Sequence, residues 1–171
     1  MKLTFKEWWP IMEMLNTKFD TLTWSNEGHK DVGIGQLDEL KIRVVLDPIT
    51  YQQYHGLNLT FATWNGKKFS EVIHAISTDK TAKIIGAVTN AFKDRIKEYE
   101  WDFLTLIAKD EVEVEKRMRL YTHIADRLAK EQLIDQINER KDGNGVIVIG
   151  KRDVDIREIW DNLQSSLTRV N

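Results

Sequence analysis

The chain has 171 residues, of which 42% are apolar and 30% are charged, as is typical of one globular domain. Its 25 Lys and Arg nearly balance its 27 Asp and Glu, and the net charge of -2 predicts no general attraction to nucleic acid or to anionic membranes. The absence of cysteine excludes disulfides, thiolate metal ligands and a cysteine nucleophile. Neither a signal peptide nor an apolar run near the ~20 residues that cross a bilayer is visible, so we expect one domain, residues 1–171, without a membrane partner.

A helix is predicted at the start of the chain. Thr4 and Glu7 have the spacing of a capping box, in which each side chain satisfies a backbone N–H of the first turn. The helix is expected over residues 5–16, with a kink at Pro10, because proline lacks the N–H and clashes with the preceding turn.

The six tryptophans are an unusual feature, because this residue is enriched in binding hot spots. Trp8 and Trp9 are adjacent and would point about 100° apart on a helix, so at least one is expected to be exposed or to cover a neighbouring element. Both are therefore candidates for contact with a partner. We expect Trp64, Trp101 and Trp160 to be buried or half-buried.

The next part of the chain has the pattern of an antiparallel meander. A short strand is predicted at 21–24, and three glycines that follow it are expected to break regular structure: Gly28, Gly33 and Gly35. Alternating apolar residues predict strands at 40–46, ended by Asp47-Pro48, and at 57–63. Asn65-Gly66 is the strongest hairpin signal, and it leads to a return strand at 69–76.

Two helices enclose a buried strand in the following segment. Thr78 or Asp79 can cap a helix whose apolar stripe reaches Tyr99. The short apolar run at 101–108 predicts a strand that is buried on both faces. A second helical stripe begins at Val114.

That second stripe loses its phase near Glu131, where we expect a break. Two interpretations of the next segment stay open: a hairpin with strands at 134–140 and 146–149, or a longer helix that reaches Arg140. An amphipathic helix capped by Asp155 closes the chain and is expected to pack on the sheet. The predicted fold is therefore α+β, with a mainly antiparallel sheet and extra N- and C-terminal helices.

The search for catalytic and metal-binding motifs is mostly negative. The sequence contains no P-loop, no dinucleotide-binding glycine motif and no nucleophile elbow, and its four histidines lack ligand spacing. The richest segment is 116–123, where Arg119 and His123 lie four apart on one helical face that can bind phosphate or carboxylate. The other interpretation is a solvated face, paired with Glu115 and Asp126.

The stretch 82–130 contains a helix, the apolar strand Phe103-Leu104-Thr105-Leu106-Ile107-Ala108, and a basic helix with an arginine before Leu120-Tyr121. This order resembles a widespread group of proteins encoded by tailed bacteriophages. It also looks like the core of the GNAT-type acetyltransferase fold, which implies antiparallel strands, helix, strand, helix and a closing hairpin.

The GNAT resemblance implies that Tyr121 matches a tyrosine that serves as general acid to the coenzyme A thiolate in those enzymes. They also carry a glycine-rich loop, whose N–H groups hold the pyrophosphate at a helix N-terminus. Here the matching segment, 77–82, has no glycine, and Asp79 would repel phosphate.

The leading hypothesis is a phage-encoded, non-catalytic protein that acts by binding another protein, as a minor virion component or as a factor directed at a host protein in the host cytoplasm. No cofactor is expected. The interaction candidates are Trp8, Trp9, Arg117, Arg119 and His123. The alternative is a divergent GNAT-type acyltransferase that uses acetyl-CoA, with Tyr121 as the acid. Nucleic-acid binding is disfavoured by the net negative charge.

Overall fold

The computed structural model describes residues 14–70, 78–108, 114–130, 137, 139–151 and 153–170. The predicted N-terminal helix, with Trp8 and Trp9, lies outside the described residues, apart from its last positions at 14–16.

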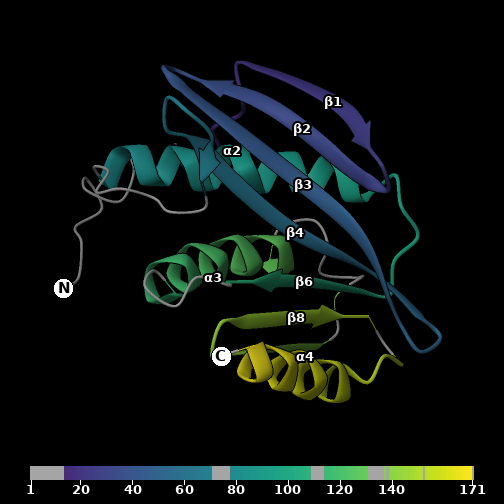
Figure 1. Cartoon of the computed structure of the whole chain (residues 1–171). Coiled ribbons are helices and arrows are strands. Elements are labelled where there is room, and N and C mark those ends of the chain that lie inside the picture. Colours follow the sequence, from purple (N-terminus) through teal and green to yellow (C-terminus); the bar gives the residue numbers. More distant parts are fainter. Residues whose placement is uncertain are drawn as a thin grey trace.

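An eight-stranded sheet forms the centre of the molecule, in the order β1-β2-β3-β4-β6-β8-β7, with β5 paired to the end of β4 (Figure 1). All neighbouring strands are antiparallel except β4 and β6, which are parallel. The strands are Thr21–Glu27 (β1), Lys30–Leu37 (β2), Leu40–Tyr51 (β3), Tyr54–Trp64 (β4), Phe69–Ser70 (β5), Phe103–Ile107 (β6), Glu139–Gly143 (β7) and Val146–Gly150 (β8).

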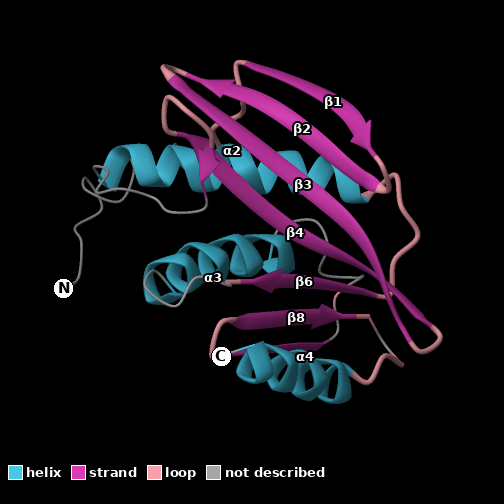
Figure 2. Cartoon of the chain, viewed as in Figure 1, coloured by secondary structure: helices cyan, strands magenta, loops and turns pink. Residues whose placement is uncertain are grey.

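The described residues form three helices: α2 (Thr78–Ile96), α3 (Val114–Lys130) and α4 (Ile156–Val170). One core cluster joins α2 and α3 to one face of the sheet, and a second joins α4 to the opposite face at β6 and β8. Figure 2 shows this arrangement, with α4 alone in front of the sheet. The predicted α+β class with a mostly antiparallel sheet is confirmed.

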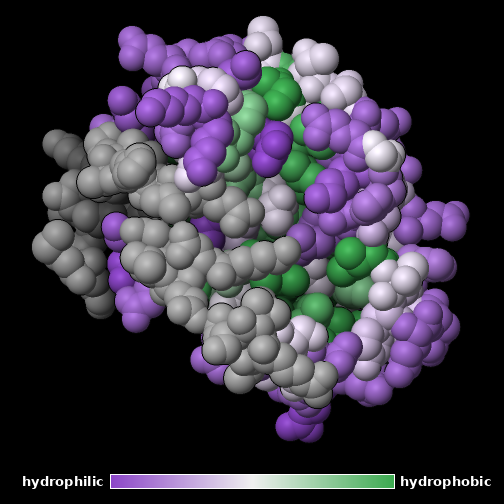
Figure 3. Space-filling view, viewed as in Figure 1, coloured by the Kyte–Doolittle hydropathy of each residue, from purple (hydrophilic) through white to green (hydrophobic). Residues whose placement is uncertain are grey.

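The two faces of β1 to β4 differ. On one face, the side chains of residues such as Ile42 and Leu59 are fully buried and belong to the core beneath α2 and α3. The alternate residues, such as Lys41 and Thr60, lie on the other face, where the packing of α4 reaches only the far end of β3, at Ile49 and Tyr51. We call this the outer face. Figure 3 shows hydrophobic residues between hydrophilic ones on the side of the molecule that faces the viewer.

Two glycines that were expected to break the chain lie inside β2, so that prediction is wrong. A side chain at Gly33 would place its Cβ 3.0 Å from the Trp24 ring, and one at Gly35 would be 2.6 Å from the Phe19 ring. The two glycines therefore make room for aromatic rings that pack on the strand from elsewhere.

The first long strand also passes through Asp47-Pro48, which was expected to end it. Pro48 lies opposite Leu57 of β4, but the pairing of β3 with β2 has already stopped at Leu46. Because the far edge of β3 has no strand partner at this point, proline's missing N–H removes no ladder hydrogen bond there.

The parallel strands β4 and β6 pair over three residues only, Gly56–Asn58 with Phe103–Thr105. The Thr105 hydroxyl donates to Asn58 Oδ1 at 2.7 Å where the pairing ends. Beyond it the strands diverge (Figure 1), and β4 next meets a strand on this edge at β5, through Thr63. We call the divergence of β4 and β6, beside residues 59–62, the fork.

The C-terminal hairpin is a strand pair in the described residues, because Glu139–Gly143 pairs with Val146–Gly150. Its turn residues Asn144 and Gly145 both have positive φ, 48° and 89°, as a two-residue hairpin turn requires. Residues 131–136, where the longer helix was the competing interpretation, lie outside the described residues.

The final helix packs on its own sheet, as expected. Ile156 and Ile159 are buried against Val148 of β8, and the Asp155 carboxylate accepts from the backbone N–H of Glu158 at 3.1 Å. This contact caps the helix.

Candidate functional site

The fork contains the side chain of Arg117, a buried cation of α3. This residue lies one helical turn before Tyr121, so both side chains leave α3 on the face that packs on the sheet. Arg117 is 4% exposed, and its Nη2 donates to the carbonyl oxygen of Phe61, on the open stretch of β4. The guanidinium thus replaces a neighbouring strand at this carbonyl.

Aromatic rings supply most of the remaining contacts of Arg117. The guanidinium carbon lies 4.1 Å from the ring centroid of Phe61 and 5.2 Å from that of Tyr121. Arg117 Nε and Nη1 have no hydrogen-bond partner among the described residues. A buried cation here is therefore held by two ring faces and one carbonyl rather than by a carboxylate.

Tyr121, the candidate acid, is fully buried. Its ring packs edge-on against Phe61, with the ring centroids 5.9 Å apart. A general acid must come within hydrogen-bond reach of the group it protonates. In this conformation the side chain belongs to the core rather than to an accessible surface.

The other face of α3 carries the remaining candidates that the structure describes. Arg119 and His123 are exposed and, with Met118 and Thr122, line an open groove of about 390 Å³. Arg119 lies 4.0 Å from Glu115, the partner expected for a solvated face. Asp126, the other expected partner, instead pairs with Arg140 of β7. The structure therefore separates Arg117 from Arg119 and His123.

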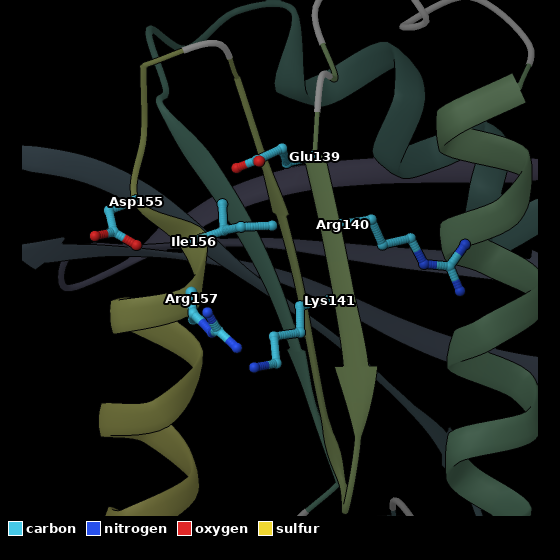
Figure 4. A pocket seen from close by; sticks show the side chains of 6 residues that line it. All are labelled: Glu139, Arg140, Lys141, Asp155, Ile156 and Arg157. Carbon is cyan, nitrogen blue, oxygen red and sulfur yellow. The ribbon is translucent and has the colours of Figure 1, made fainter.

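A second open cleft, of about 570 Å³, lies between β7 and the start of α4 (Figure 4). Lys141 and Arg157 point toward one another, whereas Arg140 points away toward α3, where it pairs with Asp126. Lys141 lies 3.8 Å from Asp161 and 4.3 Å from the ring centroid of Trp160. Arg140 and Lys141 are thus each held by a carboxylate that does not line the cleft, Asp126 and Asp161.

A buried ionic cluster ties the end of α2 to the sheet. Asp31 is 1% exposed and accepts from Arg95 Nε at 2.6 Å and Nη2 at 3.2 Å. The Tyr99 hydroxyl donates to the same carboxylate at 2.7 Å. Burial and this hydrogen bond raise the pKa of Tyr99 to about 12. The remaining Arg95 nitrogen, Nη1, donates to Glu98 at 3.0 Å, so the guanidinium is used in contacts within the fold and the role of the cluster is structural.

The part of the chain that the structure describes contains no group of side chains that could hold a metal ion. His29 lies 2.9 Å from Asp47, and His55 lines a cleft at the far end of β4. His74 falls outside the described residues.

Trp64 was expected to be buried or half-buried, and that prediction is wrong. It is 40% exposed and is the one exposed large apolar side chain among the described residues. Trp101 is 4% exposed and Trp160 is half-buried, as predicted. The sequence signal for Trp64 was its position directly before Asn65-Gly66, at the end of a strand where packing partners run out.

No protein-family model and no curated protein sequence matches the chain. Among the residues that the structure describes, no helix is both long enough and apolar enough to span a membrane.

Proposed function

We propose that this protein is non-catalytic and acts by binding another protein. The observation that carries the proposal is the filled fork, where the chain's own Arg117 and Tyr121 occupy the place in which a reaction centre would be expected. A ligand that entered there would have to displace a buried guanidinium from the Phe61 carbonyl. Breaking this hydrogen bond leaves the guanidinium of Arg117 and the carbonyl of Phe61 without each other, and this lowers the binding free energy that a ligand could gain.

The phage-like pattern of residues 82–130 supports a phage origin. A phage protein of this kind would act either in the virus particle or in the host cell. The partner is a structural protein of the particle or a protein of the host cytoplasm. The exposed residues of α3, Arg119 and His123, are candidates for that contact, because their side chains are accessible. Trp8 and Trp9 remain candidates from the sequence.

Recovery of the tagged chain from infected cells and from purified particles tests this function. Chemical cross-linking before recovery should give one partner that reappears in independent preparations. An excess of untagged chain should compete with the tagged chain for this partner. A chain that is recovered from both sources as an uncross-linked monomer would rule the function out.

The alternative, a divergent acyltransferase, has one structural observation in its favour. Strands β4 and β6 are parallel, α2 connects them, and they diverge beside a tyrosine of the following helix. We propose a GNAT-like topology on this basis, because the order of strands and helices agrees with that resemblance. Fold likeness alone does not establish activity.

A thermal-shift titration with acetyl-CoA decides between the two functions. A ligand at about a hundredfold excess over its Kd should raise the free energy of unfolding by about 2.7 kcal/mol. The non-catalytic function predicts no shift at millimolar acetyl-CoA. A saturable shift, together with acyl transfer that Tyr121→Phe abolishes, would establish the enzyme instead.

A further inference from the structure

An aromatic and basic cluster lies on the outer face at the end where β3, β4 and β5 meet. Trp64 and Phe69 are cross-strand partners in β4 and β5, and their rings are edge-on with centroids 5.1 Å apart. Lys41 Nζ lies 5.5 Å from the Trp64 centroid and 5.9 Å from that of Phe69. The guanidinium carbon of Arg43 lies 5.2 Å from the Phe69 centroid.

The turn between β4 and β5 adds two exposed cations, Lys67 and Lys68. Their backbone N–H groups both donate to Asn65 Oδ1 at 3.0 Å, which fixes the turn beside the rings. We call the whole group the basic aromatic patch. It consists of Lys41, Arg43, Trp64, Lys67, Lys68 and Phe69.

The positive charge of this patch is not neutralised within the described chain. None of its four cations forms an ion pair with a described carboxylate, and Arg43 Nε is buried without a hydrogen-bond partner there. The residues of β2 opposite two of these cations are uncharged: Gln36 lies opposite Lys41, and Ile34 lies opposite Arg43. A local excess of positive charge thus stands on a chain whose net charge is -2.

We infer that the basic aromatic patch is the docking surface for an acidic segment of the protein partner. This inference rests on the proposed function and names the surface and the chemistry of that contact. An exposed tryptophan beside arginine is the composition of interface hot spots. Glutamate or aspartate side chains of the partner would pair with the four cations, and an apolar side chain between them would cover Trp64.

The geometry favours a protein over a single-stranded nucleic acid. Bases bind such surfaces by stacking on open ring faces. Here Lys41 lies over Trp64, Arg43 lies over Phe69, and the two rings meet edge-on, so cations already cover ring faces.

A labelled peptide that alternates glutamate with leucine tests the inference, with a glutamine–leucine peptide of equal length as its control. The full chain should bind the acidic peptide, with an affinity that falls as salt is added. The double variant Lys41→Glu with Arg43→Glu should weaken binding at least about tenfold, because two attractions become repulsions. The matched control, Lys30→Glu with Lys130→Glu, carries the same net charge and should bind as the wild type does.

Four outcomes would overturn the inference: no binding of the acidic peptide, equal binding of the glutamine peptide, equal loss in the matched control, or tighter binding of an oligothymidylate of equal length. Circular dichroism of each variant checks that it is folded. Cross-linking to the partner tests the proposed function separately from the patch. A partner that cross-links equally to the wild type and to the Lys41/Arg43 variant retains that function and overturns the patch alone.

Discussion

Arg117 donates to the backbone carbonyl of Phe61 and also places its guanidinium carbon 4.1 Å from the centre of the Phe61 ring. One side chain thus satisfies a carbonyl on the open edge of β4 and packs on the ring of the same residue. The fork is closed by α3 rather than by a neighbouring strand, and this makes Arg117 part of the core.

Replacing Arg117 with alanine should lower the free energy of unfolding by about 2–4 kcal/mol, because it leaves a cavity and removes the donor to a buried carbonyl. Urea denaturation followed by tryptophan fluorescence measures the change. Arg119→Ala, on the exposed face of the same helix, should stay within about 0.5 kcal/mol of the wild type. Equal losses in the two variants would contradict the closed fork.

Asp31 is expected to be one of the most sensitive positions in the sheet. Asp31→Ala should cost about 3–5 kcal/mol, because it leaves the Arg95 guanidinium and the Tyr99 hydroxyl without their shared acceptor. Asp161 of α4 is the matched control, since its carboxylate is 61% exposed and lies 3.8 Å from Lys141. Asp161→Ala should cost less than about 1 kcal/mol in the same denaturation experiment.

Tyr99 makes stability depend on pH in the alkaline range. Its pKa is raised from 10.0 to about 12 in the folded chain, so the unfolded chain loses this proton first. The contribution is therefore complete below pH 10 and is lost as the pH rises toward 12. We expect a loss of about 1–2 kcal/mol after allowance for solvent screening.

Stability curves of the wild type and of Tyr99→Phe isolate this effect, because other tyrosines and lysines titrate equally in both. The difference between the two proteins should shrink between pH 10 and pH 12. A difference that is constant across that range would show that Tyr99 ionises alike in the folded and unfolded chains.

Gly86 is expected to resist even the smallest side chain. A Cβ there would lie 2.6 Å from the carbonyl oxygen of Met14 and 2.8 Å from that of Leu15, and both obstacles are backbone atoms. Gly86→Ala should therefore lower the free energy of unfolding by about 1–2 kcal/mol, although alanine favours helices by roughly 0.5–1 kcal/mol. Asp94→Ala, at an exposed position of the same helix, provides the control and should be near neutral. A stabilised Gly86 variant would refute the close contact.

Local patterns in the sequence predicted most of the elements. Alternation placed the strands at 40–46 and 57–63, helical stripes placed α2 and α3, and the cap at Asp155 was predicted for the last helix. These features depend on neighbours in the chain, which a single sequence displays directly.

The errors arose where a distant element decides the outcome. Gly33 looked like a chain breaker because the Trp24 ring that packs on it belongs to another strand. Pro48 is tolerated because β2 stops short of it, which only the register reveals. The burial of Arg117 could have been suspected, since it lies four residues before Tyr121 in the apolar stripe. Its contact with Phe61 could not be predicted, because that contact depends on where β4 and β6 diverge.

The three-residue pairing of β4 with β6 also shapes how the chain reaches its native state. Strands β1 to β4 join neighbours through short turns, so they can assemble early and independently. The contact of Asn58 with Thr105 spans 47 positions and closes a loop that includes the whole of α2. Such a closure carries a larger entropy cost and few hydrogen bonds to offset it, which makes the joining of the two halves the expected slow step of folding.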